Sequence, residues 1–173
     1  MKLTKRKKAA FPLLAKPTNG KKLIIPNQKK FSNDWLRAHG CSIVAEYIAL
    51  QWGGIKKSHT ALLNWHKKNT PEYVKSKVTL RGIAEGINKI GKGKLKATFY
   101  SEPTTELIAK AIEKRRLVIF EQGGPIHSVV LIPDADGVYV ASNGTVKRIL
   151  ISTIIKKATK NKTYRGMIVV KSL

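Results

Sequence analysis

The chain has 173 residues, 42% of them hydrophobic, which is enough for one compact domain and too short for two domains with separate cores. Its 34 Lys and Arg against 10 Asp and Glu give a formal net charge of +24, which indicates a partner rich in negative charge without specifying its kind. The single cysteine excludes an internal disulfide, and no stretch approaches the ~20 apolar residues of a membrane helix.

The beginning of the chain differs in composition from the rest. Residues 1–22 predict a basic, flexible arm, and residues 23–173 predict one folded domain. Four consecutive cations of the arm are the candidate contact with an anionic surface or nucleic acid: Lys5, Arg6, Lys7 and Lys8. The apolar stretch that follows, residues 9–15, contains Pro12 and is short and broken for a signal-peptide core. We therefore expect a cytoplasmic protein of a microbe or a mobile element, with non-classical export as the alternative.

Apolar residues at helical spacing predict four helices in the first part of the domain. The first helix opens at Cys41 and ends at the Gly53-Gly54 pair. Capping residues bound the others, which run from Ser58 to before Thr70, from Thr79 to Gly91, and onward from Pro103-Thr104. A short apolar segment before them, Leu23 to Ile25, predicts an edge strand.

Strand-like patterns dominate the second part of the domain. The predicted strands are residues 95–100, 117–120, 127–132, 137–141, 146–151 and 164–170, with a short helix at 152–158 between the last two. Helices first and a mostly antiparallel sheet second predict an α+β fold in two layers. The helix that opens at Cys41 belongs to the layer that packs on the sheet.

Cys41 is the candidate nucleophile. A lone cysteine is often a small buried hydrophobe, but this one directly precedes an apolar helix. The unpaired N–H groups and the positive dipole end of a helix N-terminus favour a thiolate over a thiol. A thiolate is the form that attacks a carbonyl carbon.

His127 is the candidate general base. It opens the apolar strand of residues 127–132, directly after Gly123-Gly124-Pro125, so a loop gives access to its ring. His59 and His66 lie on a helix among Lys and Asn residues and are interpreted as structural. His39 lies too near Cys41 in the chain to be the partner that approaches from the opposite layer.

Asn143 is the candidate third residue, at the end of the strand that follows His127. An amide or carboxylate that accepts from an imidazole N–H fixes the orientation and tautomer of the ring. The Asn143-Gly144 pair is also a common hairpin turn and needs no catalytic explanation. Both interpretations stay open, and Asp136 is the alternative orienting residue.

The ordered set of motifs resembles the papain-like cysteine peptidases, in particular stand-alone relatives of the bacteriocin-leader (double-glycine) peptidases. The motifs are Trp35, Gly40-Cys41-Ser42, Gly53-Gly54, Leu117 to Phe120, His127 to Ile132 and Gly137 to Asn143. The resemblance spans roughly Leu23 to Val170 and implies a papain-like fold, acyl transfer through a thioester, and Cys41, His127 and Asn143 as the triad. The family commonly has Asp at the third position, so Asn143 is a departure.

The oxyanion-binding side chain is a second departure. The family places a Gln shortly before the nucleophile, whereas the residue six positions before Cys41 is Trp35. Gln28 and Asn33 are the candidate substitutes. The alternative interpretation of each is an ordinary polar residue on the surface of a loop. The implied mechanism uses the Cys41 backbone N–H and one of these side chains to stabilise the oxyanion.

The function expected from these residues is a cysteine peptidase or amidase that acts on a peptide or protein substrate. The sequence shows no metal-ligand spacing, and Gly91 to Lys94 lacks the spacing of a phosphate-binding loop, so we expect no cofactor. Two alternatives stay open: a non-catalytic module that binds nucleic acid or another polyanion on a papain-like scaffold, and a cysteine-dependent acyltransferase.

Overall fold

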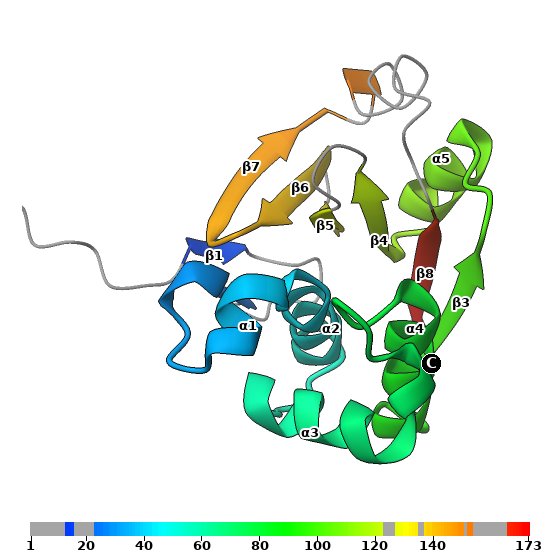
Figure 1. The fold of residues 1–173 in the computed structure, drawn as a ribbon. Helices are drawn as coiled ribbons and strands as arrows, with labels where there is room; N and C mark the ends of the chain where they lie inside the picture. Colours follow the sequence, from blue (N-terminus) through cyan, green and yellow to red (C-terminus); the bar gives the residue numbers. More distant parts are fainter. Residues whose placement is uncertain (1–12, 16–22, 123–126, 135–136, 151, 154–165) are drawn as a thin grey trace, which may run out of the picture.

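The computed structural model describes residues 13–15, 23–122, 127–134, 137–150, 152–153 and 166–173 (Figure 1). Its helices are α1 (Asp34–His39), α2 (Cys41–Trp52), α3 (His59–Asn69), α4 (Leu80–Ile90) and α5 (Thr105–Glu113), with 3-10 turns η1 (Gln28–Lys30) and η2 (Pro71–Tyr73). Its strands are β1 (Leu13–Ala15), β2 (Leu23–Ile25), β3 (Leu95–Tyr100), β4 (Leu117–Gln122), β5 (His127–Asp134), β6 (Gly137–Ser142), β7 (Thr145–Ile149) and β8 (Met167–Ser172).

Six of the strands form one antiparallel sheet in the order β3-β8-β4-β5-β6-β7. The last strand of the sheet in sequence, β8, lies between β3 and β4. The hydrogen bonds between β3 and the rest of the sheet therefore run through β8. The strands β5, β6 and β7 form a meander, and their register places the end of β6 beside the start of β5. This corner carries the candidate site.

The two faces of the sheet bury different side chains, because successive residues of a strand point to opposite faces. Ile119, Val130 and Ile168 belong to the core that the sheet shares with α2, α3 and α4. Val118, Val129 and Val169 belong to a second core, which α5 covers with Ile108 and Ile112. Figure 1 shows α2, α3 and α4 grouped together, with α5 apart from them beside β8. The α+β fold with the Cys41 helix packed on an antiparallel sheet is confirmed, with α5 added on the far face.

Local hydrogen bonds explain why the predicted helix boundaries are close to the observed ones. The side chains of Ser58, Thr79 and Thr104 accept from backbone N–H groups in the first turns of α3, α4 and α5. Gly53 and Gly91 follow the last residues of α2 and α4 as expected. These interactions join residues that are close together in the chain, so the helix boundaries can be predicted from the sequence.

The structure adds elements that the pattern did not predict. A separate helix, α1, fills the segment before Cys41, and the predicted edge strand β2 pairs with β1 to form a small second sheet. Of the predicted short helix at 152–158, only Ser152 and Thr153 are described, and they are helical. The cationic cluster Lys5 to Lys8 lies outside the described residues. Within the part of the chain that the structure describes, no helix is both long enough and apolar enough to span a membrane.

Candidate active site

The candidate nucleophile lies at a corner between two helices. Gly40 ends α1 and begins α2, and a Cβ at this position would lie 2.3 Å from the Leu36 carbonyl oxygen. The corner therefore requires glycine, and Cys41 becomes the first residue of α2. No side chain caps this helix, so the first N–H groups of α2 have neither an intrahelical acceptor nor a capping side chain. The positive end of the helix dipole lies at the thiol.

The Cys41 thiol is buried, with 8% of the residue exposed, and burial alone would raise its pKa. Against this burial, the interactions of the thiol with the His127 side chain, with the backbone and side chain of Ser128, and with the charge of His127 lower the pKa. The Ser128 Oγ has no hydrogen-bond partner, so the His127 ring, whose influence on the thiol is the largest of the lowering causes, is the interaction on which the site depends. The lowering causes win, and the pKa of Cys41 falls below its ordinary value. The structure thus brings Cys41 and His127, 86 positions apart in the sequence, into direct interaction.

The register of β5 explains why two adjacent residues reach the same sulfur. Ser128 belongs to the alternating set that includes Val130 and Ile132, which face α2, and it is only 4% exposed. His127 opens the strand beside Gln122 of β4, at the edge of the helix layer. We infer that a hydroxyl and an amide from Ser128 and a ring from His127 surround the thiol from the sheet side.

The second contact of the His127 ring is with Ser142. The ring Nε2 and the Ser142 Oγ share a hydrogen bond, and the two residues lie diagonally across the β5–β6 pair. Because Nε2 takes part in this bond, Nδ1 is the ring nitrogen that remains for Cys41. Sequence analysis passed over Ser142, although its place next to Asn143 at the end of β6 was a signal that could have found it.

Asn143 occupies the turn between β6 and β7, and its Oδ1 makes no hydrogen bond to His127. Its φ is 45°, followed by Gly144 at 73°, which are the positive values of the hairpin turn that Asn-Gly favours. The Asn143 Oδ1 atom is buried and has no hydrogen-bond partner. Asn143 therefore lies one residue from the histidine contact, while Ser142 makes it. Asp136, the alternative, lies outside the described residues.

Gln28 and Asn33 differ sharply in their surroundings. Gln28 is buried, and its Nε2 donates to the Arg37 carbonyl oxygen at 3.1 Å, four residues before Cys41. The preceding residue, Asn27, packs so closely on the β6–β7 turn that a Cβ on Gly144 would lie 2.7 Å from the Asn27 Cβ. Asn33 is exposed, and its Oδ1 caps α1 by accepting from Leu36 N at 3.0 Å. Of the two candidates, only Gln28 is buried, and its segment contacts both the helix before Cys41 and the β6–β7 turn.

A second polar cluster lies farther along α2, and sequence analysis did not predict it. Glu46 and His66 are fully buried, and Glu46 Oε2 lies 2.8 Å from His66 Nε2. The other ring nitrogen of His66, Nδ1, lies 2.8 Å from Thr70 Oγ1. Gly86 of α4 makes room for the pair, since a Cβ there would lie 2.1 Å from Glu46 Oε1. His66 is structural, as predicted, but with a buried acid as its partner.

Burial favours the neutral form of the acid in this pair. Burial is the main cause that raises the pKa of Glu46, although the hydrogen bond and charge of His66 act in the opposite direction. Glu46 Oε1 has no partner, which costs much less for the carbonyl oxygen of a neutral acid than for a carboxylate. Among the described residues, no group of three His, Cys, Asp or Glu could hold a metal ion.

Comparison with known proteins bears on the fold. A scan against family models and a search of curated proteins returned no match. Among solved structures, the crystal structure of UfSP from C. elegans is similar with a TM-score of 0.54 over 97% of this chain, at 13% sequence identity. The chain spans 36% of the length of that protein. At this identity the similarity shows the fold alone, a papain-like α+β arrangement.

Proposed function

We propose that the chain is a thiol-dependent hydrolase, a cysteine peptidase or amidase, with Cys41 as nucleophile and His127 as general base. The observation that carries the proposal is the lowered pKa of one buried thiol, which lies at the N-terminus of α2 and interacts with the His127 side chain. A cysteine that served only as a core hydrophobe would not need a histidine neighbour and a lowered pKa. The papain-like fold supports the same reaction class.

Acylation begins when the Cys41 thiolate attacks the carbonyl carbon of an amide. A C–S bond forms, the carbonyl oxygen becomes an oxyanion, and the His127 imidazolium then protonates the leaving nitrogen as the C–N bond breaks. The products of this half-reaction are a free amine and a Cys41 thioester. His127, now neutral, removes a proton from water, and the water oxygen attacks the thioester carbonyl carbon. The C–S bond then breaks, the carboxylic acid product leaves, and the Cys41 thiolate and His127 imidazolium are restored.

Two groups are placed to stabilise the oxyanion. The backbone N–H of Cys41 is in the first turn of α2, where no intrahelical acceptor exists. The Gln28 amide is the side-chain candidate, because it is buried beside the segment that leads to Cys41. Ser142 has the positioning role for the His127 ring, and Asn143 is the alternative for that role.

The test is hydrolysis of a broad fluorogenic peptide pool under reducing conditions, with intact mass measured during turnover. Because Cys41 is the only cysteine, a covalent adduct has one assignable thiol. We expect an acyl-enzyme mass in the wild type and none in Cys41→Ala, with His39→Ala as the matched control because His39 is exposed on α1. Turnover that survives in Cys41→Ala would contradict the proposal, as would a wild type that never acylates. Release of the acyl group only to added amines would identify an acyltransferase.

A further inference from the structure

Two hollows flank α3 on the helical side of the molecule, and both are lined by Lys57. The first has a volume of about 600 Å³ and lies between β2, α2 and the start of α3, with Ile24 and Tyr47 in its wall. The second has a volume of about 250 Å³ and lies between α3 and the end of α4, with Trp65 and Ile90 in its wall. Cys41 lines neither of them.

The charged residues that line the hollows are all basic. No acidic residue occurs between Gly53 and Pro71, a segment that includes all of α3, and no acidic residue lines either hollow. Lys56 and Lys57 lie at the first hollow, and Lys57 and Lys89 lie at the second. Burial lowers the pKa of His59 to about 4, so His59 is neutral near pH 7 and the positive charge comes from the lysines.

The walls of the hollows are apolar side chains rather than open backbone. Ile24 is 41% exposed, which is unusual among the large hydrophobic residues of the described chain. The Gln51 side chain pairs with the Ile24 backbone, accepting from its N–H at 3.4 Å and donating to its carbonyl at 3.0 Å. The free edge of β2 is therefore already paired at this point, and a ligand meets side chains instead of a strand edge.

The chemistry favours an acidic peptide over a nucleic acid. Base stacking needs aromatic faces that are free, whereas the Tyr47 ring is packed on His59 at 4.1 Å and His59 on Phe31 at 4.4 Å. The Trp65 ring in the second hollow is packed against the buried His66 ring at 5.1 Å. Ile24 is the aliphatic residue of the first hollow, beside the polar Gln51 and Ser58, and the aliphatic residues of the second are Ala61, Leu62 and Ile90. Aliphatic walls rimmed by lysines are complementary to a chain that alternates aliphatic and acidic side chains.

We propose that the two hollows flanking α3 bind an acidic, amphipathic peptide segment of a partner protein. The aliphatic side chains of that segment enter the hollows, and its carboxylates pair with Lys56, Lys57 and Lys89. The surface lies apart from the thiol, so binding does not require the reaction proposed for Cys41. A substrate that docks here would be held by a region distant from the bond that is cleaved.

The test measures binding of fluorescein-labelled synthetic peptides by anisotropy, with the full chain at ~0.15 M salt, where exposed charges beyond about 8 Å are screened. The main probe alternates Glu and Leu. Three further probes separate the contributions: Glu alternating with Ser keeps the charge, Lys alternating with Leu reverses it, and oligothymidylate tests a nucleic acid. We expect the Glu-Leu peptide to bind about tenfold more tightly than the Glu-Ser peptide and the Lys-Leu peptide not to bind.

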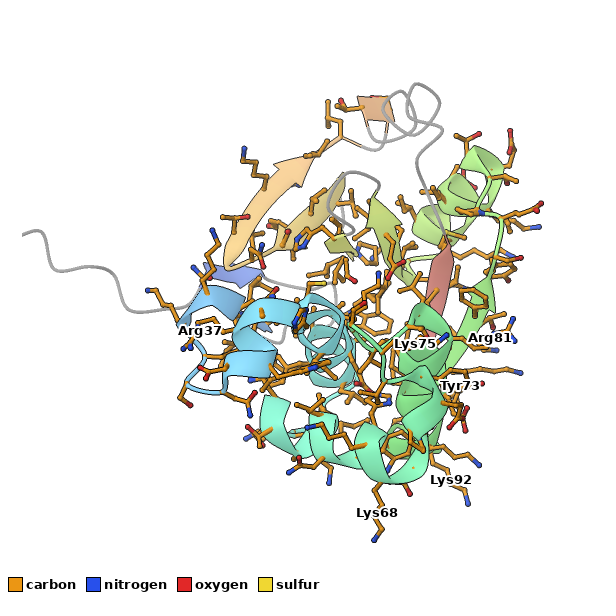
Figure 2. The ribbon with its side chains drawn as sticks, in the orientation of Figure 1. Arg37, Lys68, Tyr73, Lys75, Arg81 and Lys92 are labelled. Carbon is orange, nitrogen blue, oxygen red and sulfur yellow. The ribbon has the colours of Figure 1, made fainter. Side chains whose placement is uncertain are left out.

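Variants locate the site. Lys57→Glu, which changes both hollows, should weaken binding of the Glu-Leu peptide by about tenfold or more. The matched control Lys75→Glu makes the same charge change at an exposed position outside both linings, labelled in Figure 2, and should have a much smaller effect. Ala61→Gln fills the second hollow without a charge change and should also weaken binding, whereas Asn64→Gln on the same helix should not. Thermal unfolding of each variant checks that the fold is intact.

Each remaining outcome is decisive. Equal binding of the Glu-Ser peptide, or equal loss in Lys57→Glu and Lys75→Glu, would overturn the proposal, because only the overall charge would then be acting. Tighter binding of oligothymidylate with the same variant sensitivity would assign the surface to nucleic acid and overturn it as well. Cys41→Ala should bind the Glu-Leu peptide like the wild type, so failure here and failure of the proposed hydrolysis are separate results.

Discussion

Helix α2 carries two histidine-centred clusters that are alike in composition and different in setting. At its start, Cys41 contacts His127, whose ring also bonds to the Ser142 hydroxyl. Farther along, Glu46 contacts His66, whose ring also bonds to the Thr70 hydroxyl. In both clusters an ionisable group of α2 meets an imidazole that a hydroxyl orients.

Burial separates the roles of the two clusters. His66 is 0% exposed and lies among the core side chains of α2, α3 and α4, so no substrate can reach it. His127 is only partly buried and lies at the start of a strand, where its ring is accessible. The fully buried Glu46–His66 cluster, here called the sealed cluster, can hold helices together. The accessible Cys41–His127 cluster can exchange protons with a ligand. Residue types alone would not distinguish them.

The largest effect is expected from breaking the sealed cluster. Glu46→Ala leaves the buried His66 ring without its partner and opens a cavity, which should lower the free energy of unfolding by about 3 kcal/mol or more. Urea denaturation measures this change. The matched control is Glu72→Ala, an exposed acid that should change stability by no more than about 0.5 kcal/mol. Similar values for the two variants would show that the buried pair does not hold the helices.

A substitution in the accessible Cys41–His127 cluster should change the reactivity of the thiol more than the stability of the fold. His127→Ala removes both the hydrogen bond and the charge that lower the pKa of Cys41, and burial then raises it. Alkylation by iodoacetamide near pH 7 should therefore slow, by about tenfold for each unit that the pKa rises, with its pH profile moved to higher pH. His39→Ala should leave the profile unchanged. A wild-type rate equal to that of a free thiol would contradict the lowered pKa.

A smaller effect decides which residue orients His127. Ser142→Ala removes the Oγ that bonds to Nε2 and should slow alkylation and peptide hydrolysis by about tenfold. Asn143→Gly deletes the competing amide and keeps the positive φ of the turn, so it should change these rates little. The reverse order of effects would assign the orienting role to Asn143. Restored activity in Ser142→Thr would indicate that the hydroxyl, not the volume, is what matters.

The smallest expected effect is a change in the pH dependence of stability. The pKa of Glu46 is raised in the folded state, so folding retains a proton on this acid that the unfolded chain releases. Its contribution to stability is therefore full below the ordinary Glu pKa and is lost as the pH rises through the raised value. Glu46→Gln cannot titrate. The stability of the wild type relative to Glu46→Gln should fall as the pH rises above the ordinary Glu pKa of about 4.3, and a constant difference in urea denaturation would contradict this.

Most of the fold was predictable because its signals are local. Ser58, Thr79 and Thr104 act on N–H groups two or three residues away, and each marks a helix start in the sequence and in the structure. The helix α1 was missed because its six residues follow an N-cap, Asn33, that was interpreted as a loop or oxyanion residue. The pairing of β8 between β3 and β4 carries no local signal.

The candidate site divides in the same way. Cys41 at a helix start and His127 at a strand start were both recognisable along the chain, and the structure brings them together. The end of this strand was recognisable as the place of the third residue, but the choice between Ser142 and Asn143 was not, because a shift of one residue along a strand turns a side chain to the opposite face. That choice depends on the register of β6 against β5.

The α+β order of elements, the helix that begins at Cys41 and the excess of positive charge could be read along the chain. They depend on the spacing of apolar residues, on caps and on composition, which act at short range or need no folding at all. The burial of His66 against Glu46, the partial exposure of His127 and the place of Lys57 between two hollows depend instead on packing. Burial depends on which distant segments pack together, and packing sets both the pKa of a group and what can reach it.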